Sequence, residues 1–538
     1  MGDAQSDTPS DEVRPAQAPR PDASLGRHAA RGVSWLLAQS LASKVAGVAG
    51  NLALGWLLMP EAFGLIGMAY SVSTFVSLVS QAGLREILTQ RHKRSALWVT
   101  PGFWLSVVGG LLGMLAMLGI APLVAKAYGE PELVGLLAVL ALTTFLHSLA
   151  AGADAQLHGQ LRFGFLGAFG VLTTVGKVLL TIALAALGFG AYSVVLPALV
   201  FAGVNAAVLW WHAPIRPTWN LQFRRWKYLV ASSLFVFGAT GLYTLMTQSG
   251  SIFLGLFSTA AAVGLFYFAF ALALQPLMLL GHALRRVLLP TLARMNTQPS
   301  RQAAALERAT RLLILLVIPL AWFQIPLARD FMSAVFPERW EPAVLVLQML
   351  SIAIPLRAFG WTGGAALQAQ GRFKLQFGLS VIGVTGSFAV AALTAWIGPV
   401  WLVALGFSLF VMVLEPATYA IASRQPVGQA MTPFMRPLSV GALGTFACLL
   451  AAESARPFTE SPWAPLLVGA SLGSIAYAVL VRVMLPESWH DMRAQLKHVV
   501  PTRLRRLIPF ARPAPAPIPF DADAVDPIAD PTPARRAS

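Results

Sequence analysis

Three basic residues stand inside long apolar stretches of this sequence, namely Lys44, Lys177 and Arg357. Lys44 follows Arg31 by 13 residues, which corresponds to roughly 20 Å along a helix. An ionisable side chain at such a depth in a membrane is costly, so its presence indicates a function. A cationic site with little water attracts anions, and a guanidinium group suits phosphate or carboxylate. The alternative for each residue is structural, as half of an ion pair or as a cap on helix carbonyl groups.

Polar residues accompany these bases at helical spacing. One face of the first apolar stretch carries Ser40, Lys44, Gly47 and Asn51, and adding 200 gives Thr240, Thr244, Thr247 and Ser251, bordered by Tyr243 and Gln248. A polar stripe cannot face lipid cheaply, so two matching stripes favour a shared cavity. Helix packing through small and hydroxyl residues is the alternative.

The apolar stretches also hold one histidine and two acids of interest. His147 is the counterpart of Arg357, 210 residues earlier, and we count it among the cavity residues. Asp154 and Glu415 lie near the inner ends of their stretches. A local structural role is favoured for both acids, and the binding of a coupling proton is the alternative.

The sequence contains no recognisable catalytic or metal-binding motif. It lacks a Walker loop, an HExxH motif and a cysteine–histidine set at metal spacing. It also lacks the large polar loop that usually carries acids and histidines in an enzyme of lipid or sugar chemistry. We therefore expect neither enzymatic activity nor a cofactor or metal, and transport is the better interpretation.

The elements that position these residues are membrane helices. Hydrophobic residues make up 56% of the 538-residue chain and charged residues only 12%, against about 25% charged in soluble domains. The apolar runs are uninterrupted and long enough to span a bilayer, which favours helices over an outer-membrane barrel. We predict fourteen spans: 32–58, 62–82, 102–127, 133–157, 164–187, 191–211, 229–256, 260–283, 311–334, 342–369, 375–396, 398–421, 437–454 and 464–484.

The basic residues are distributed unevenly around these spans. If the N-terminus is cytoplasmic, 32 of the 39 Lys and Arg residues fall in inner segments, and only Lys126, Arg329, Arg339 and Arg456 fall in outer ones. The positive-inside rule then places both termini in the cytoplasm of a multi-pass inner-membrane protein. The net charge of +16 is mostly a signal of topology, and we expect no nucleic-acid partner. The single cysteine, Cys448, excludes a disulfide framework.

One short motif occurs twice, which indicates a duplication. "LHGQLRF" (157–163) and "LQAQGRF" (367–373) share Leu, Gln, Arg and Phe at an offset of 210, and "FGL" (63–65) matches "VGL" (263–265) at an offset of 200. Spans 7–12 would then repeat spans 1–6 as a parallel repeat, the plan of many alternating-access transporters. Chance similarity among apolar helices is the alternative.

The resulting organisation has six parts. We expect a disordered cytoplasmic tail (1–30), an N-lobe of six spans (31–212), a C-lobe of six spans (213–425), an appended pair of spans (426–485), a basic interfacial segment (486–510) and a disordered Pro/Ala-rich tail (511–538). The segment 486–510 could lie on the inner membrane surface, or it could merely obey the positive-inside rule.

Several longer stretches resemble a known family. "LLMPEAFGLIGMAYSVSTFVSLVSQAGLREILTQR" (57–91) looks like the signature of polysaccharide exporters, and "APLVAKAYGEPEL" (121–133), "GFGAYSVV" (188–195) and "FPERWEPAVLVLQMLSIAIP" (336–355) follow in family order. The region 30–425 is similar to Wzx-type flippases, especially the colanic-acid-exporter-like branch of the multidrug/oligosaccharidyl-lipid/polysaccharide superfamily.

The resemblance implies a V-shaped transporter with two helical lobes, like the multidrug-exporting (MATE) members of that superfamily. Its substrate would be an undecaprenyl-pyrophosphate-linked oligosaccharide, moved to the periplasmic leaflet for assembly of exopolysaccharide, capsule or lipopolysaccharide O-antigen. Membrane lipids would contact the substrate tail, and a polysaccharide polymerase and a chain-length regulator would be partners. The cationic cavity would hold the pyrophosphate, with Lys44, Lys177, Arg357 and His147 as bases and Asn51, Thr244, Gln248 and Ser251 along the path.

The sequence departs from the family pattern in its charges. "LGWLLMP" (54–60) lacks the Ala-Arg pair often found there, Gly250 aligns with a common Asp, and Gln81 replaces another. These losses leave the substrate and any ion coupling open. The alternatives are a drug or metabolite antiporter of the same superfamily, which would favour acids in its cavity, and a membrane scaffold of a polysaccharide synthase complex. A glycosyltransferase is disfavoured because the chain has no acidic metal-binding cluster.

Overall fold

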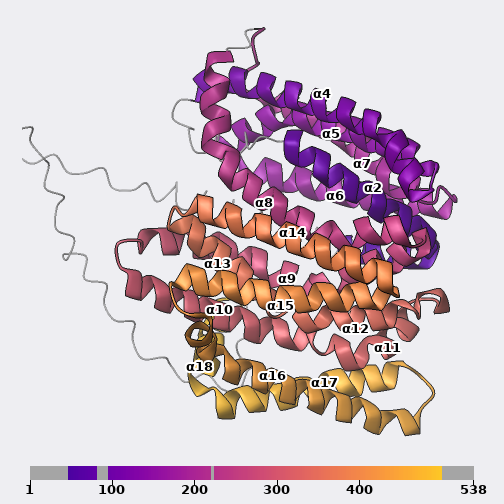
Figure 1. Cartoon of the computed structure of the whole chain (residues 1–538), viewed down its shortest axis with the longest axis vertical. Helices are drawn as coiled ribbons and strands as arrows, with labels where there is room; N and C mark the ends of the chain where they lie inside the picture. Colours follow the sequence, from indigo (N-terminus) through magenta and orange to yellow (C-terminus); the bar gives the residue numbers. More distant parts are fainter. Residues whose placement is uncertain (1–45, 81–94, 161, 220–222, 500–538) are drawn as a thin grey trace, which may run out of the picture.

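The computed structural model describes residues 46–80, 95–160, 162–219 and 223–499, and this part of the chain is built from helices. The prediction of an all-α membrane protein is thereby confirmed. The N-lobe lies beside the C-lobe, and the appended helices lie on the far side of the C-lobe (Figure 1). Lys44 and the two predicted disordered tails lie outside the described residues.

The helices follow the order of the predicted spans. The N-lobe comprises the helix Ala46–Leu57, α2 (Pro60–Ser80), α4 (Ser95–Tyr128), α5 (Glu132–Gly159), α6 (Phe163–Ala186) and α7 (Tyr192–His212). The C-lobe comprises α8 (Phe223–Phe257), α9 (Ala260–Arg294), α10 (Pro299–Ala321), α11 (Gln324–Val335), the short 3-10 helix η2 (Glu338–Trp340), α12 (Ala343–Ala353), α13 (Arg357–Ala369), α14 (Phe373–Ile397) and α15 (Val400–Ser423).

The appended part consists of α16 (Val427–Ala455), η3 (Arg456–Phe458), α17 (Trp463–Met484) and α18 (Pro486–Val499). Arg456 forms an ion pair with Asp330 of α11 at 2.9 Å, and Arg308 of α10 pairs with Asp491 of α18. Two ion pairs thus join these helices to the C-lobe. The part of the predicted interfacial segment that is described therefore packs against the lobe.

Two of the predicted spans, 311–334 and 342–369, are each formed by two helices that meet at a break. The helices α10 and α11 meet at 42°, and α12 and α13 meet at 45°. Proline explains both breaks because it has no N–H to donate to the carbonyl four residues earlier. At Pro326 the carbonyl of Trp322 accepts a hydrogen bond from the N–H of Ile325 instead. At Pro355 the carbonyl of Ser351 accepts one from the N–H of Ile354.

The length and hydropathy of the helices fit a multi-pass protein. Within the described ranges, nine helices are long and apolar enough to cross a membrane, or up to eleven if each bent pair counts as one. The described helices include one or a bent pair for each predicted span, with span 1 seen only in part. The figure of fourteen spans is consistent with this arrangement and stays a prediction.

The two copies of the repeated motif fold alike. At the first copy the N–H of Gln160 bonds the carbonyl of Gln156, and at the second copy the N–H of Gln370 bonds that of Ala366. The backbone of Arg162 (φ −73°, ψ 48°) matches that of Arg372 (φ −84°, ψ 49°), and each precedes the next helix. The duplication is therefore seen in the helix joints as well as in the residue types.

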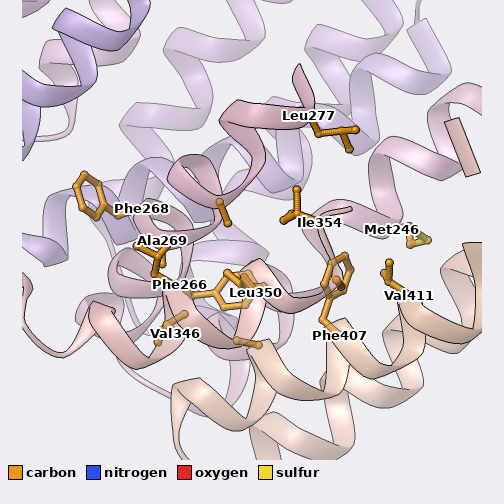
Figure 2. Packing of buried hydrophobic residues seen from close by; sticks show 14 of the residues in the cluster. Met246, Phe266, Phe268, Ala269, Leu277, Val346, Leu350, Ile354, Phe407 and Val411 are labelled. Atoms are coloured by element: carbon orange, nitrogen blue, oxygen red, sulfur yellow. The ribbon is translucent and has the colours of Figure 1, made fainter. Parts of the chain in front are cut away.

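The main hydrophobic core runs through both lobes and into the appended helices. Figure 2 shows part of this core, including Phe266 and Leu277 of α9, Leu350 of α12 and Phe407 of α15. Each of these side chains is nearly fully buried. This apolar surrounding sets the cost of any polar group placed among these helices.

The lobes touch through two glycines that are related by the repeat. A Cβ on Gly64 of α2 would lie 1.8 Å from the carbonyl oxygen of Ala260, and one on Gly264 of α9 would lie 1.8 Å from that of Pro60. The backbones of α2 and α9 can come this close only because both residues lack a side chain. Since 64 and 264 differ by the 200-residue offset, the contact is pseudo-symmetric and joins the lobes at one end.

Candidate functional site

Arg357 is the first residue of α13, directly after the break at Pro355, and its side chain is buried. Its Nη2 donates a hydrogen bond to the hydroxyl of Tyr243 at 3.0 Å. The guanidinium lies 5.7–5.9 Å from the ring centres of Tyr243, Phe270 and Phe407. Such cation–π contacts favour a buried cation. The Nε and Nη1 atoms have no hydrogen-bond partner among the described residues.

Tyr243 connects this base to a buried acid. Its hydroxyl donates to Oε1 of Glu415 at 3.3 Å, so Arg357, Tyr243 and Glu415 form one chain across α13, α8 and α15. Glu415 is as buried as Arg357. A Cβ on Gly360 would lie 1.2 Å from Oε2 of Glu415, so the carboxyl group occupies the space of a missing side chain.

This chain borders a cavity of about 240 Å³ inside the C-lobe. Helices α8, α9, α13, α14 and α15 supply its walls, and the polar side chains that line it are Tyr243, Thr244, Trp361, Gln376, Ser380, Glu415 and Thr418. The Oε1 of Gln376 is buried and has no hydrogen-bond partner among the described residues. The cavity can therefore hold a few water molecules or a small polar group between acceptor oxygens and the hydroxyl of Tyr243.

The N-lobe carries a second basic site. His147 of α5 and Lys177 of α6 lie close enough to interact electrostatically. Gly50 of the first described helix packs against Val178, the neighbour of Lys177. Asn51 and Lys177 thus belong to adjoining helices at similar depth. His147 is exposed and Lys177 is half-buried, so both are more accessible than Arg357.

The remaining predicted residues are distributed over both lobes. Thr244 is exposed and faces the C-lobe cavity, whereas Gln248 is half-buried and Ser251 is buried further along the same helix. Asp154 lies 3.2 Å from Nδ1 of His158, one turn away on α5. The structure thus brings Arg357, Thr244 and Glu415 together in the C-lobe. In the N-lobe it places His147 near Lys177, with Asn51 on a helix that adjoins that of Lys177. The roles of these residues stay predictions.

Sequence reasoning missed the central position of Tyr243, which it noted only as a neighbour of the polar stripe. It also gave no role to Gly360 or to Trp340 of the "FPERW" motif. For Tyr243 the available signal was its place beside Thr244 on a polar helix face. The bonds that it makes join residues 114 and 172 positions apart, which no local pattern reveals.

Comparison with known proteins identifies the family. The sequence pattern of the family described as "Polysaccharide biosynthesis protein" matches residues 53–345, which is more than half of the chain. The chain belongs to this family. The resemblance to polysaccharide exporters predicted from the motifs is thereby confirmed.

Several curated relatives have names from the same field. Succinoglycan biosynthesis transport protein ExoT of Rhizobium meliloti (strain 1021) is 25% identical over 443 residues, covering 80% of this chain and 87% of ExoT. Teichuronic acid biosynthesis protein TuaB of Bacillus subtilis (strain 168) is 25% identical over 316 residues, covering 57% of this chain and 64% of TuaB. Lipopolysaccharide biosynthesis protein WzxC of Escherichia coli (strain K12) is 24% identical, covering 59% of this chain and 65% of WzxC. The chain thus spans slightly less than two thirds of TuaB and WzxC.

Solved structures share the architecture. Lipid II flippase MurJ, in an inward closed conformation, superimposes with a TM-score of 0.69 at 12% identity and covers 84% of this chain and 99% of MurJ. The MATE transporter VcmN of Vibrio cholerae superimposes with a TM-score of 0.52 at 15% identity and covers 76% and 97%. At these identities the similarity shows the fold alone, and the predicted MATE-like fold is confirmed.

Proposed function

We propose that this protein is a flippase that moves undecaprenyl-pyrophosphate-linked oligosaccharide units across the inner membrane for the assembly of a surface polysaccharide. The observation that carries the proposal is the match with the succinoglycan transport protein along 80% of this chain and 87% of that protein. The two-lobed fold supports it, since two repeated lobes that rock about a central site are a common transporter plan.

The orientation follows from the charges. The positive-inside rule places both termini in the cytoplasm. The loop between Leu57 and Pro60 and the η2 segment then face the periplasm, together with the glycine contact of α2 and α9. In this orientation the lobes are joined at the periplasmic end, and the substrate enters from the cytoplasmic leaflet.

Electrostatics supports an anionic headgroup as the substrate. Two opposite unit charges 4 Å apart attract by about 4 kcal/mol at an effective dielectric constant of 20. His147 and Lys177 are accessible bases of the N-lobe, and we assign them, with Lys44, to the pyrophosphate. Asn51, Gln248 and Ser251 would line the path of the glycan.

The buried acid suggests how transport could be coupled to an ion. Glu415 shares a hydrogen-bonded chain with Arg357 and adjoins the C-lobe cavity. We assign it to proton coupling, with Asp154 as the second candidate. A polysaccharide polymerase and a chain-length regulator would receive the product on the periplasmic side, and membrane lipids would hold the polyprenyl tail.

The test replaces one accessible base and compares it with a base outside the site. Lys177→Gln is expected to slow the outward movement of labelled lipid-linked oligosaccharide in reconstituted vesicles at least tenfold, because about 1.4 kcal/mol of lost attraction already gives that factor. Lys126→Gln removes the same charge from an exposed position at the end of α4 and should leave the rate unchanged. Equal rates for both variants would remove the electrostatic argument. Normal polymer production in cells by a variant that cannot flip would favour a scaffold.

A further inference from the structure

The C-terminal end of the first described helix is capped by the opposite lobe. The last four carbonyl groups of a helix have no partner within the helix. In Ala46–Leu57, the carbonyl of Gly55 accepts a hydrogen bond from Nε1 of Trp340 at 2.8 Å and from Nη2 of Arg339 at 3.3 Å. The same guanidinium also donates to the carbonyl of Trp56. Arg339 in addition places a positive charge at the negative end of the helix dipole.

Aromatic rings from both lobes enclose this cap. Trp340 has no exposed surface, and its ring stacks on Phe268 at 4.0 Å and meets Phe63 of α2 edge-on at 5.1 Å. Phe336 lies directly on Gly55, where a Cβ would come within 2.6 Å of its ring. The residues of the "FPERW" motif (336–340) therefore form a compact contact with the N-lobe.

Only half of this contact is repeated by the pseudo-symmetry. Gly255, the counterpart of Gly55, packs against the ring of Tyr128, which ends α4 as Phe336 follows α11. At the offset of 208 that pairs Phe336 with Tyr128, however, Arg339 and Trp340 correspond to Pro131 and Glu132, whose side chains offer no hydrogen-bond donor. In the described part of the chain, the hydrogen-bonded part of the seal thus belongs to one side alone.

We propose that Arg339 and Trp340 form the latch of the periplasmic gate. They hold the first helix to the C-lobe in the state described here, and outward opening requires their bonds to the carbonyls of Gly55 and Trp56 to break. The proposal rests on the orientation given with the proposed function. The pseudo-symmetric glycine contact of α2 and α9 lies at the same end of the molecule and must separate together with the latch.

The test measures access to the gate and needs no substrate. Cys448, the single cysteine, is replaced by alanine, and Val263→Cys places a reporter at a fully buried position of α9 beside Gly264. Labelling by a membrane-impermeant maleimide added to the periplasmic side of intact spheroplasts reports gate opening. Trp340→Phe keeps a ring but loses the indole donor, and it should raise the labelling rate about tenfold, since a buried carbonyl loses a partner.

A second tryptophan provides the matched control. Trp322 also donates from Nε1 to a carbonyl, that of Ile352 at 3.0 Å, but both residues belong to the C-lobe. Trp322→Phe should therefore leave the labelling rate within about twofold of the parent. An unchanged rate in Trp340→Phe, or an equal rise in both variants, would overturn the proposal. Labelling from the cytoplasmic side alone would also overturn it, because the sealed end would then face inward.

A glycine variant tests the same gate at the contact of α2 and α9. Gly64→Ala would place a Cβ 1.8 Å from a backbone oxygen of the other lobe and should keep the gate from closing, whereas Gly119→Ala has open space around it. We expect the reporter to be labelled faster than in the parent in Gly64→Ala and not in Gly119→Ala. Labelling as slow as in the parent would contradict the close contact. If the protein does not flip the substrate but the labelling rates of the variants change as expected, the result would count against the proposed function and not against the latch.

Discussion

Gly360 offers a sharp test of the buried chain in the C-lobe. A methyl group at this position would lie 1.2 Å from Oε2 and 2.3 Å from Cδ of Glu415, so the carboxyl group must move. Overpacking costs about 1–3 kcal/mol, and loss of the bond from Tyr243 costs about 1–3 kcal/mol more. The better helix propensity of alanine returns about 1 kcal/mol. Gly360→Ala should therefore destabilise the protein by about 3 kcal/mol.

Gly364 is the matched control, one turn further along α13. Its nearest neighbour would be Nε2 of Gln376 at 3.7 Å, an ordinary contact, so Gly364→Ala should be neutral or stabilising by up to about 1 kcal/mol. Thermal unfolding in detergent reports the difference as a shift of opposite sign for the two variants. In a Glu415→Ala background the penalty of Gly360→Ala should disappear, because no carboxyl group remains to clash. Similar midpoints for both glycine variants, or an undiminished penalty in that background, would refute the packing described here.

Two further predictions concern polar contacts of the C-lobe. Tyr243→Phe removes the hydroxyl between Arg357 and Glu415 and should lower the free energy of unfolding by about 3 kcal/mol, because two buried charged groups lose their shared partner. A thermal midpoint equal to that of the parent would show that the hydroxyl is dispensable. Arg456→Gln leaves the nearly buried Asp330 without its ion pair and should cost about 1–2 kcal/mol, whereas Arg329→Gln breaks only a pair of exposed groups and should cost almost nothing. Equal midpoints for these two arginine variants would contradict the stronger attachment of the appended helices.

The helices could be predicted because apolar length alone identifies a membrane span. Their breaks could not. Pro326 and Pro355 interrupt two spans, yet Pro122, Pro197 and Pro276 lie inside continuous helices. A proline removes one hydrogen bond in every case, and the packing of the neighbouring helices decides whether the chain bends there.

The site was predictable in its residue types and not in its grouping. Depth in the apolar runs correctly marked Arg357 and Glu415 as buried ionisable residues. Their connection through Tyr243 depends on the tertiary packing of three helices, and Gly360 is required only because α13 and α15 approach each other closely. Such features leave no periodic signal in the sequence.

The two lobes differ at one position of the repeat, which carries His147 in the N-lobe and Arg357 in the C-lobe. His147 and Arg357 correspond at an offset of 210, but α5 runs straight through His147 whereas Pro355 starts a new helix at Arg357. The break turns α13 by 45° relative to α12, and Arg357 at its first residue is buried between the rings of Phe270 and Phe407. His147 stays exposed near Lys177. The cations of the N-lobe are therefore the more exposed ones, while the C-lobe joins its own cation through Tyr243 to an acid. This difference in exposure supports our proposal that substrate binds to the first lobe and that an ion is coupled in the second.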